Sequence, residues 1–250
     1  MNTAHFEYVQ RLGDNALILG QRLSAWCGHS PFLEEDIAMA NTALDLIGRA
    51  RMLYSHAAAI EGQGRDEDAL AYGRDERQFG NFLICELPNG DYAFTLLRQY
   101  LIDVYHHQLF LALCTSGDST LAAIAAKAVK ETAYHLRRSG DWVVRLGDGT
   151  DESHRRCQAA VDELWAYTGE MFAGDAIDSA MAEQGIGVDP AGLEPAWREA
   201  VANLFKRATL LQPRDDWQAS GGRAGLHTEH MGHLLTELQF LQRAYPGLKW

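Results

Sequence analysis

The chain has 250 residues, of which 47% are hydrophobic, and a formal net charge of −12 at pH 7. This length is enough to build one substantial core, so we expect a single domain over residues 1–250. The excess of acidic groups argues against nucleic acid as a partner, because phosphate backbones are bound by basic surfaces.

Neither a targeting segment nor a membrane span is expected from the sequence. Residues 1–13 lack the apolar stretch of a signal peptide, and no run of about 18 apolar residues occurs. The cysteines form no Cys-x-x-Cys pair, which favours reduced thiols in a cytoplasmic protein. They stand at Cys27, Cys85, Cys114 and Cys157.

Helical periodicity dominates the first part of the chain. Apolar residues recur at helical steps from Tyr8 to Trp26, and this helix should end before Pro31, because the residue preceding proline disfavours helix. A second helix is predicted over residues 32–61. Its apolar stripe consists of Ile37, Ala40, Leu44 and Ile47. Residues 66–89 are expected to be shorter and more broken, up to the turn at Pro-Asn-Gly.

The second part continues with helices. Residues 92–114 are apolar almost all round, as expected of a central helix, and residues 121–146 carry a heptad-like stripe. That stripe consists of Leu121, Ala125, Ala128, Thr132, His135, Ser139, Trp142 and Leu146. Further helices are predicted at 151–172, 175–184, 193–211 and 228–244, with 212–225 as the loosest region. The predicted class is all-α, a helical bundle with additional C-terminal helices.

Residues 130–135 resemble half of a carboxylate-bridged di-iron site. In a ferritin-like bundle, two helices each supply a Glu and two others each supply a Glu-x-x-His pair. Here Thr132 stands three residues before His135, where the Glu would be, and Glu131 lies about 100° off that face. No Glu-x-x-His occurs in the sequence. We therefore expect a ferritin-like bundle that has lost its metal.

Three other groups could bind a metal. Asp103 is predicted to face the interior and to pair with His135 in a metal-free hydrogen-bonded cluster, with a weak metal site as the alternative. Residues 151–154, Asp-Glu-Ser-His, should face solvent. The histidine-rich cluster His227–His233 could hold a single ion, but a helix capped by Thr228 accounts for most of its pattern.

Basic pairs and charge runs suggest contacts with phosphate or with a partner. The pairs most able to meet the phosphates of Coenzyme A are Arg137 with Arg138 and Arg155 with Arg156, although surface ion pairing is the preferred interpretation. The charge run at residues 74–77 is interpreted as a solvated face, with a partner interface as the alternative. The sequence has no phosphate-binding glycine loop and no serine or cysteine nucleophile motif.

Taken together, several segments resemble the C subunits of bacterial phenylacetyl-CoA 1,2-epoxidases, multicomponent oxygenases of phenylacetate degradation. The resemblance covers essentially the whole chain. It is carried by residues 11–15 (Arg-Leu-Gly-Asp-Asn), 26–29 (Trp-Cys-Gly-His), 44–51 (Leu-Asp-Leu-Ile-Gly-Arg-Ala-Arg), 74–79 (Arg-Asp-Glu-Arg-Gln-Phe), 134–137 (Tyr-His-Leu-Arg) and 225–230 (Gly-Leu-His-Thr-Glu-His).

This resemblance implies a ferritin-like fold and a non-catalytic structural role beside a homologous A subunit. That A subunit would carry the di-iron centre and bind most of the phenylacetyl-CoA, and a B subunit would bridge such pairs. A separate reductase with FAD and an iron–sulfur cluster would supply electrons from NADPH. This chain itself is expected to hold no cofactor. Two alternatives stay open: a di-iron oxygenase or ferroxidase acting alone, and a subunit that contributes to binding the Coenzyme A substrate.

The resemblance also assigns the vestigial metal positions. Leu46–Arg49 in this chain corresponds to one Glu-x-x-His of the A subunit, Thr132–His135 corresponds to the other, and Asp103 matches a carboxylate position between them. Of the four motif ligands only His135 remains. We hypothesise that Arg49 forms an ion pair with Asp103 in place of the metal charge.

Overall fold

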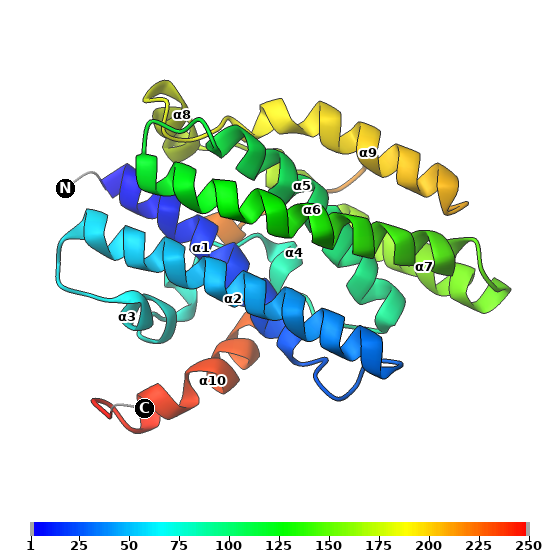
Figure 1. Cartoon of the computed structure of the whole chain (residues 1–250), viewed down its shortest axis with the longest axis horizontal. Coiled ribbons are helices and arrows are strands. Elements are labelled where there is room, and N and C mark those ends of the chain that lie inside the picture. Colours follow the sequence, from blue (N-terminus) through cyan, green and yellow to red (C-terminus); the bar gives the residue numbers. More distant parts are fainter. Residues whose placement is uncertain (1–2, 249–250) are drawn as a thin grey trace. The chain divides into compact units, whose positions relative to one another are not determined.

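The computed structural model describes residues 3–248, which are helical with connecting loops and contain no strand in that range (Figure 1). The predicted all-α class is confirmed. The chain divides into two compact units. Unit 1 comprises the residues up to Pro88 and those from Gly221 onward, and unit 2 comprises Asn89–Ser220. The expectation of one domain stays a prediction, because this division does not say whether either unit folds alone.

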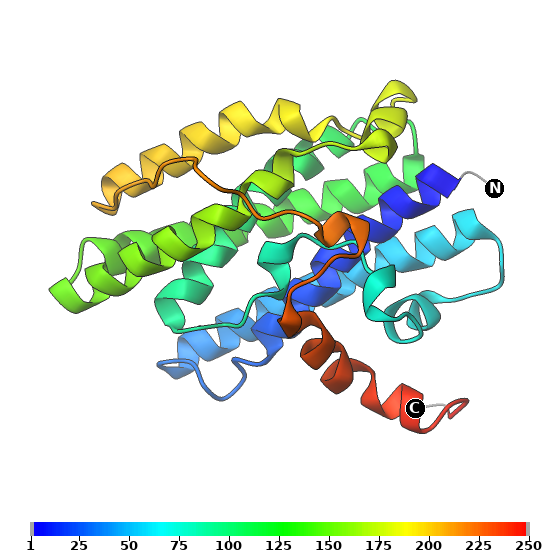
Figure 2. The same cartoon turned by 180° about the vertical axis from the view of Figure 1, so that it is seen from behind.

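Unit 1 is built on a pair of long antiparallel helices, α1 (Thr3–Ser24) and α2 (Leu33–Glu61), which lie side by side in both views (Figures 1 and 2). Gly62 ends α2 in a left-handed conformation, with φ of 67°, and its N–H donates to the carbonyl of Ala58. The helix pair buries apolar side chains from both partners. They include Val9, Ile18, Leu19, Leu23, Met39, Leu46 and Leu53.

Short elements and a returning segment complete unit 1. They are α3 (Glu67–Tyr72), the 3₁₀ turn η1 (Glu76–Gln78), α4 (Leu83–Glu86), η5 (Gly222–Ala224) and α10 (Glu229–Ala244). Asp66 caps α3 and Thr228 caps α10 by accepting backbone N–H groups, as such residues do at helix starts. The broken character predicted for residues 66–89 and the helix predicted at 228–244 are both confirmed.

Unit 2 is built on a second antiparallel pair, α5 (Tyr92–Leu113) and α6 (Ser119–Gly147). Most of α5 is buried, in agreement with its nearly uniform apolar sequence. The predicted stripe of α6 faces the core from Leu121 to Ser139. Trp142 and Leu146 at its end are half-buried, and Val143 and Gly147 are buried instead.

Three helices and three 3₁₀ turns complete unit 2. They are α7 (Asp151–Leu164), η2 (Trp165–Tyr167), η3 (Gly169–Phe172), α8 (Ala176–Glu183), η4 (Pro190–Leu193) and α9 (Glu194–Arg207). The rings of Trp165 and Phe172 each contact the ring of Trp197, and Trp165 also contacts Phe205. The Trp197 indole N–H donates to the carbonyl of Leu101 at 2.8 Å. The helix predicted over residues 151–172 ends at Leu164, where 3₁₀ turns follow. The loose region predicted at 212–225 contains no helical residue before η5.

The apolar stripe of α2 differs from the usual arrangement, because it faces solvent. Ile37 is 52% exposed and Leu44 64%, whereas Leu46 and Arg49, on another side of the same helix, are each 1% exposed. Helical spacing predicts which residues share a face, but it does not say which partner covers that face.

Two further expectations concern cysteines and membranes. Cys85 and Cys157 are buried, Cys27 and Cys114 are exposed, and none of the four is in a disulfide. Within residues 3–248, none of the helices combines the length and apolarity that a membrane crossing requires.

Candidate functional site

The two vestigial positions in unit 1 are both inside the protein. Leu46 and Arg49 stand about one turn apart on the buried face of α2. An iron centre needs anionic or imidazole donors, and this face offers an apolar side chain and a guanidinium. A buried cation at this position would repel a metal ion rather than bind it.

In unit 2, Asp103 is held by hydrogen bonds from its own helix and from α6. Its Oδ1 accepts the Gln99 Nε2–H at 2.7 Å, and its Oδ2 lies 2.9 Å from the Ser139 hydroxyl. The Ser139 hydroxyl also lies 2.9 Å from the carbonyl of His135, so its single proton can serve either acceptor. A buried polar cluster lies here as predicted. The direct Asp103–His135 pair stays a prediction.

Thr132 and His135 are both buried, as the stripe of α6 predicts. The Thr132 hydroxyl donates to the carbonyl of Ala128 at 2.9 Å, and Nδ1 of His107 lies 3.1 Å from the same oxygen. The His107 tautomer sets which of these two groups is the donor. Burial lowers the pKa of His107, which is consistent with a neutral ring. The Thr132 hydroxyl is therefore hydrogen-bonded to its own helix, and the residue has no carboxylate that could bind a metal.

These residues do not fit a di-iron centre. Unit 1 supplies no metal ligand at Leu46 or Arg49, and unit 2 supplies one carboxylate whose two oxygens already have hydrogen-bond partners. A bridged pair of irons takes four carboxylates and two imidazoles. The hypothesised Arg49–Asp103 ion pair joins residues of different units and stays a prediction, as does the absence of a cofactor.

The four arginines considered for a contact with Coenzyme A phosphates differ in their surroundings. Arg137 is exposed and lies over the Tyr134 ring at 5.7 Å, while Arg138 is half-buried. Arg155 and Arg156 both pair with Glu152, which lowers the pKa of that carboxyl, and Arg156 also pairs with Asp91 at 3.3 Å. Arg155 and Arg156 therefore form surface ion pairs, which is the interpretation preferred from the sequence. A Coenzyme A contact of these arginines stays a prediction.

The histidine-rich segment at the start of α10 does not converge on one point. The His227 side chain has no exposed surface and lies 2.7 Å from Glu86 Oε2 through Nδ1, while its Nε2 lies 3.0 Å from the carbonyl of Phe79. Both ring nitrogens face acceptors, an arrangement that favours the doubly protonated and positively charged ring. Glu229, by contrast, is exposed. His227 therefore anchors the segment instead of serving as a ligand.

Glu86 is the centre of this anchor. Its carboxylate also accepts the Asn81 amide at 2.9 Å and the Thr228 N–H at 2.6 Å. Burial by itself lowers the pKa of His227, but the hydrogen bond and charge of Glu86 outweigh burial, so this pKa is raised above its ordinary value of 6.5. Nearby, Gly225 has φ of 73° and a Cβ there would lie 2.3 Å from the carbonyl of Arg77, so only glycine fits.

The charge run at residues 74–77 contains a residue that is not solvated. Arg74 is buried and ion-paired with Asp14, and its other donors reach the carbonyls of Leu70 at 2.6 Å and Gln78 at 2.7 Å. Asp14 also accepts the Tyr54 hydroxyl at 2.7 Å. The interpretation as a solvated face is wrong for Arg74, because local charge density does not reveal a partner 60 residues away.

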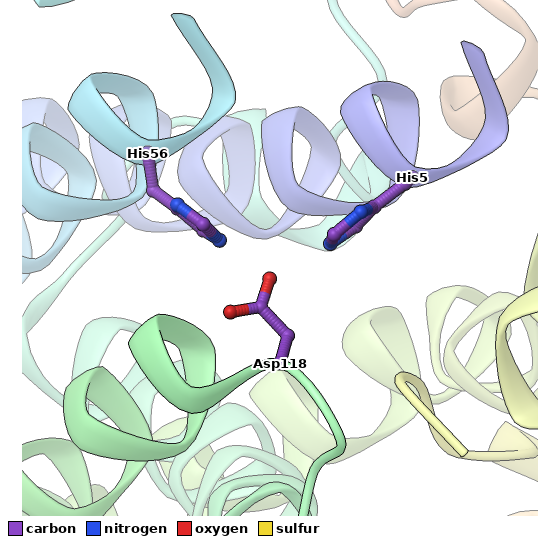
Figure 3. A group of neighbouring side chains, drawn as sticks. All are labelled: His5, His56 and Asp118. Carbon is purple, nitrogen blue, oxygen red and sulfur yellow. The ribbon is translucent and has the colours of Figure 1, made fainter. Parts of the chain in front are cut away.

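Two further histidines of unit 1 were not identified from the sequence. His5 on α1 and His56 on α2 form an edge-to-face pair with ring centroids 6.0 Å apart (Figure 3). Asp118, also labelled in Figure 3, belongs to unit 2, where it caps α6 by accepting the N–H groups of Thr120 and Leu121.

Helical pairs with inward polar positions define an all-α protein of the ferritin-like class, here with a donor set that does not fit its usual metals. The model of the family described as "Phenylacetic acid catabolic protein" matches residues 1–250, and the chain belongs to that family. It is 53% identical over 243 residues to the C subunit of the 1,2-phenylacetyl-CoA epoxidase of Escherichia coli (strain K12). That alignment covers 97% of this chain and 98% of the relative.

Proposed function

We propose that this chain is a non-catalytic structural subunit of an oxygenase that epoxidises phenylacetyl-CoA, and that it stabilises a catalytic subunit. The observation that carries the proposal is the 53% identity to a C subunit of such an epoxidase along nearly the full length of both chains. The relative is named as one subunit among several. We therefore expect this chain also to work within an assembly.

The side chains at the vestigial positions support a role without catalysis. Leu46, Arg49 and Thr132 offer no carboxylate, and Asp103 is engaged by Gln99 and Ser139. In this proposal, the di-iron centre and most of the phenylacetyl-CoA are bound by the catalytic A subunit. The B subunit bridges the pairs, and the reductase supplies electrons.

The exposed face of α2 supports a helical partner. Its apolar residues follow one another at alternating steps of four and three, which is the spacing of a coiled-coil seam. They are Leu33, Ile37, Ala40, Leu44 and Ile47. An apolar row of this kind on a surface marks an interaction site. We propose that a helix of the A subunit packs against it.

Co-expression with the A subunit tests this function. The A subunit alone should be unstable or inactive, and its epoxidase activity should recover when this chain is present, because the chain holds its helices in register. An A subunit that is fully active alone would contradict the proposal. So would two irons per chain in elemental analysis of this chain purified by itself.

A matched pair of variants tests the α2 face. The double variant Ile37→Asp/Leu44→Asp places charges in the proposed seam and should abolish co-purification with the A subunit. Leu211→Asp makes the same kind of change at a residue that is 75% exposed outside α2, and it should leave pairing intact. Unchanged helicity of each purified variant shows that the chain still folds. Equal pairing of all forms would place the interface elsewhere.

A further inference from the structure

In unit 1, helix α10 has one buried side and one open side. The helix contacts α3, α4 and η1, and its buried residues include Met231, Leu234 and Leu235. Along the other side, a stripe of residues at helical spacing is exposed or half-buried. The stripe consists of Glu229, Gly232, Thr236, Phe240 and Arg243. Phe240 is 60% exposed, so a large apolar ring stands at the surface where residues 3–248 give it little cover.

Part of this stripe lines a groove of about 580 Å³ between α10 and η1. Gly232 and Thr236 lie at one end of the groove, and Phe240 lies eight residues from Gly232, about 12 Å along the helix. A Cβ on Gly232 would meet one side-chain atom, Glu76 Oε2 at 3.2 Å, which is the end of a flexible side chain. Packing within the chain therefore does not explain a glycine here. Glycine weakens a helix and is typical of a close approach by another group.

The polar side chains of the groove form hydrogen bonds within unit 1. The Thr236 hydroxyl donates to the carbonyl of Gly232 at 2.8 Å. The Gln239 amide donates to the carbonyl of Arg74 at 3.0 Å, and its oxygen accepts the Arg243 Nε–H at 2.8 Å. Covering the groove leaves none of these groups without a partner, so an apolar side chain can fill it at little cost in hydrogen bonding.

We propose that the groove is an interface between two copies of this chain, in which their α10 helices pack antiparallel. A two-fold axis at Thr236 brings residues that are equally distant from it opposite one another. Gly232 of one copy then faces Phe240 of the other, and Glu229 faces Arg243. Each groove receives one ring, and each end of the contact gains an ion pair.

The charges of the stripe favour this orientation. The Glu229 side chain is 84% exposed at the start of α10, and the Arg243 side chain is 49% exposed in its last turn. Arg243 uses Nε and Nη2 within its own chain, and its Nη1 group has no acceptor among residues 3–248. That group can donate to a carboxylate of the second copy. A parallel pair would instead oppose Glu229 with Glu229 and align the two helix dipoles unfavourably.

This inference goes beyond the proposed function. It concerns α10 and a second copy of the chain, whereas the proposed contact with the A subunit uses the exposed face of α2. The two contacts involve different residues and are measured separately.

Sedimentation velocity of the full chain by itself, over a concentration series, tests the proposal. The chain should form a dimer. Phe240→Glu should raise the dissociation constant of that dimer about a hundredfold or more, because two buried rings are lost and two charges enter the grooves. Trp217→Glu is the matched control. Trp217 is a 70% exposed aromatic residue outside α10, and its replacement should leave the dissociation constant unchanged.

Cysteine cross-linking tests the position of the two-fold axis. Thr236→Cys should give a disulfide-linked dimer under mild oxidation, because the axis brings the two side chains together. Leu241→Cys is the control, since Leu241 is 47% exposed on α10 outside the stripe and should not cross-link. The wild-type chain, with its exposed Cys27 and Cys114, gives the background.

Four results would overturn this interface. They are a chain that stays monomeric at every concentration, a dimer that persists in Phe240→Glu, an equal loss of the dimer in Trp217→Glu, and equal cross-linking of the two cysteine variants. Loss of co-purification with the A subunit in Phe240→Glu, with a monomeric wild-type chain, would assign the groove to that subunit. Pairing through the α2 face has its own variants, so failure of this interface and failure of the proposed function remain distinguishable.

Discussion

The two units each bury an aspartate on a long helix, but they satisfy it differently. Asp14 in unit 1 is ion-paired with the Arg74 guanidinium and accepts hydrogen bonds from the Tyr54 hydroxyl and the Gly80 N–H. Within unit 2, Asp103 receives hydrogen bonds from the uncharged side chains of Gln99 and Ser139. Removing one partner of a buried ion pair leaves an uncompensated charge, whereas removing a hydroxyl leaves one weaker bond unmade. Replacing Arg74 should therefore lower the free energy of unfolding more than replacing Ser139.

The largest effect is expected from Arg74→Ala. It leaves Asp14 buried without its cation and should lower the free energy of unfolding by about 3–5 kcal/mol. Urea denaturation followed by circular dichroism measures this loss. Arg77→Ala, three residues away and exposed, is the control and should cost little. A loss below about 1 kcal/mol in Arg74→Ala would show that the network contributes little to stability.

The anchor of His227 should make stability depend on pH. Its pKa is raised by Glu86, so the stabilisation is complete below pH 6.5 and is lost as the pH rises through the higher pKa of the folded state. We expect a loss of stability as the pH rises above about 6.5 that is absent in His227→Gln. Denaturation series at several pH values measure it. The exposed His29→Gln should keep the wild-type slope, and a flat wild-type profile would contradict the assignment.

A smaller effect is expected in unit 2. Ser139→Ala removes the hydroxyl beside Asp103 Oδ2 and should lower the free energy of unfolding by about 1–2 kcal/mol. Ser119→Ala, at the exposed start of the same helix, should have little effect. If Ser139→Ala proved as damaging as Arg74→Ala, the two networks would be equivalent in strength.

The smallest effect concerns a surface pair. Arg155→Ala removes an exposed partner of Glu152 and should leave the melting temperature unchanged, because exposed ion pairs gain little and are screened by salt. Differential scanning fluorimetry at low and high salt measures the melting temperature. A drop of several degrees would show that this pair contributes more to stability than an exposed ion pair does.

Most of the fold was predictable, and the stripe of α6 shows why. Its residues from Leu121 to Ser139 are spaced at helical steps and face the core of unit 2. The stripe of α2 has equally regular spacing and is exposed. Periodicity therefore predicted both helices and the grouping of residues on each. It could not say that the α2 stripe would be left uncovered by this chain.

The candidate site was predictable only in part. The inward positions of Thr132 and His135 followed from the spacing along one helix, and the interior position of Asp103 was predicted as well. The importance of Arg74 and His227 was not foreseen, because their partners Asp14 and Glu86 are 60 and 141 residues away. No local pattern distinguishes such an arginine from its solvated neighbour Arg77.

The sequence by itself determined the helices, their caps and turns, and the residues that share each helical face, because these depend on interactions within about one turn of the chain. Only the tertiary structure decided which faces are covered, which charges are paired, and where a groove opens beside α10. Those outcomes depend on segments that are distant in sequence and meet when the core forms. The cost of burying a charge then selects which distant groups must meet.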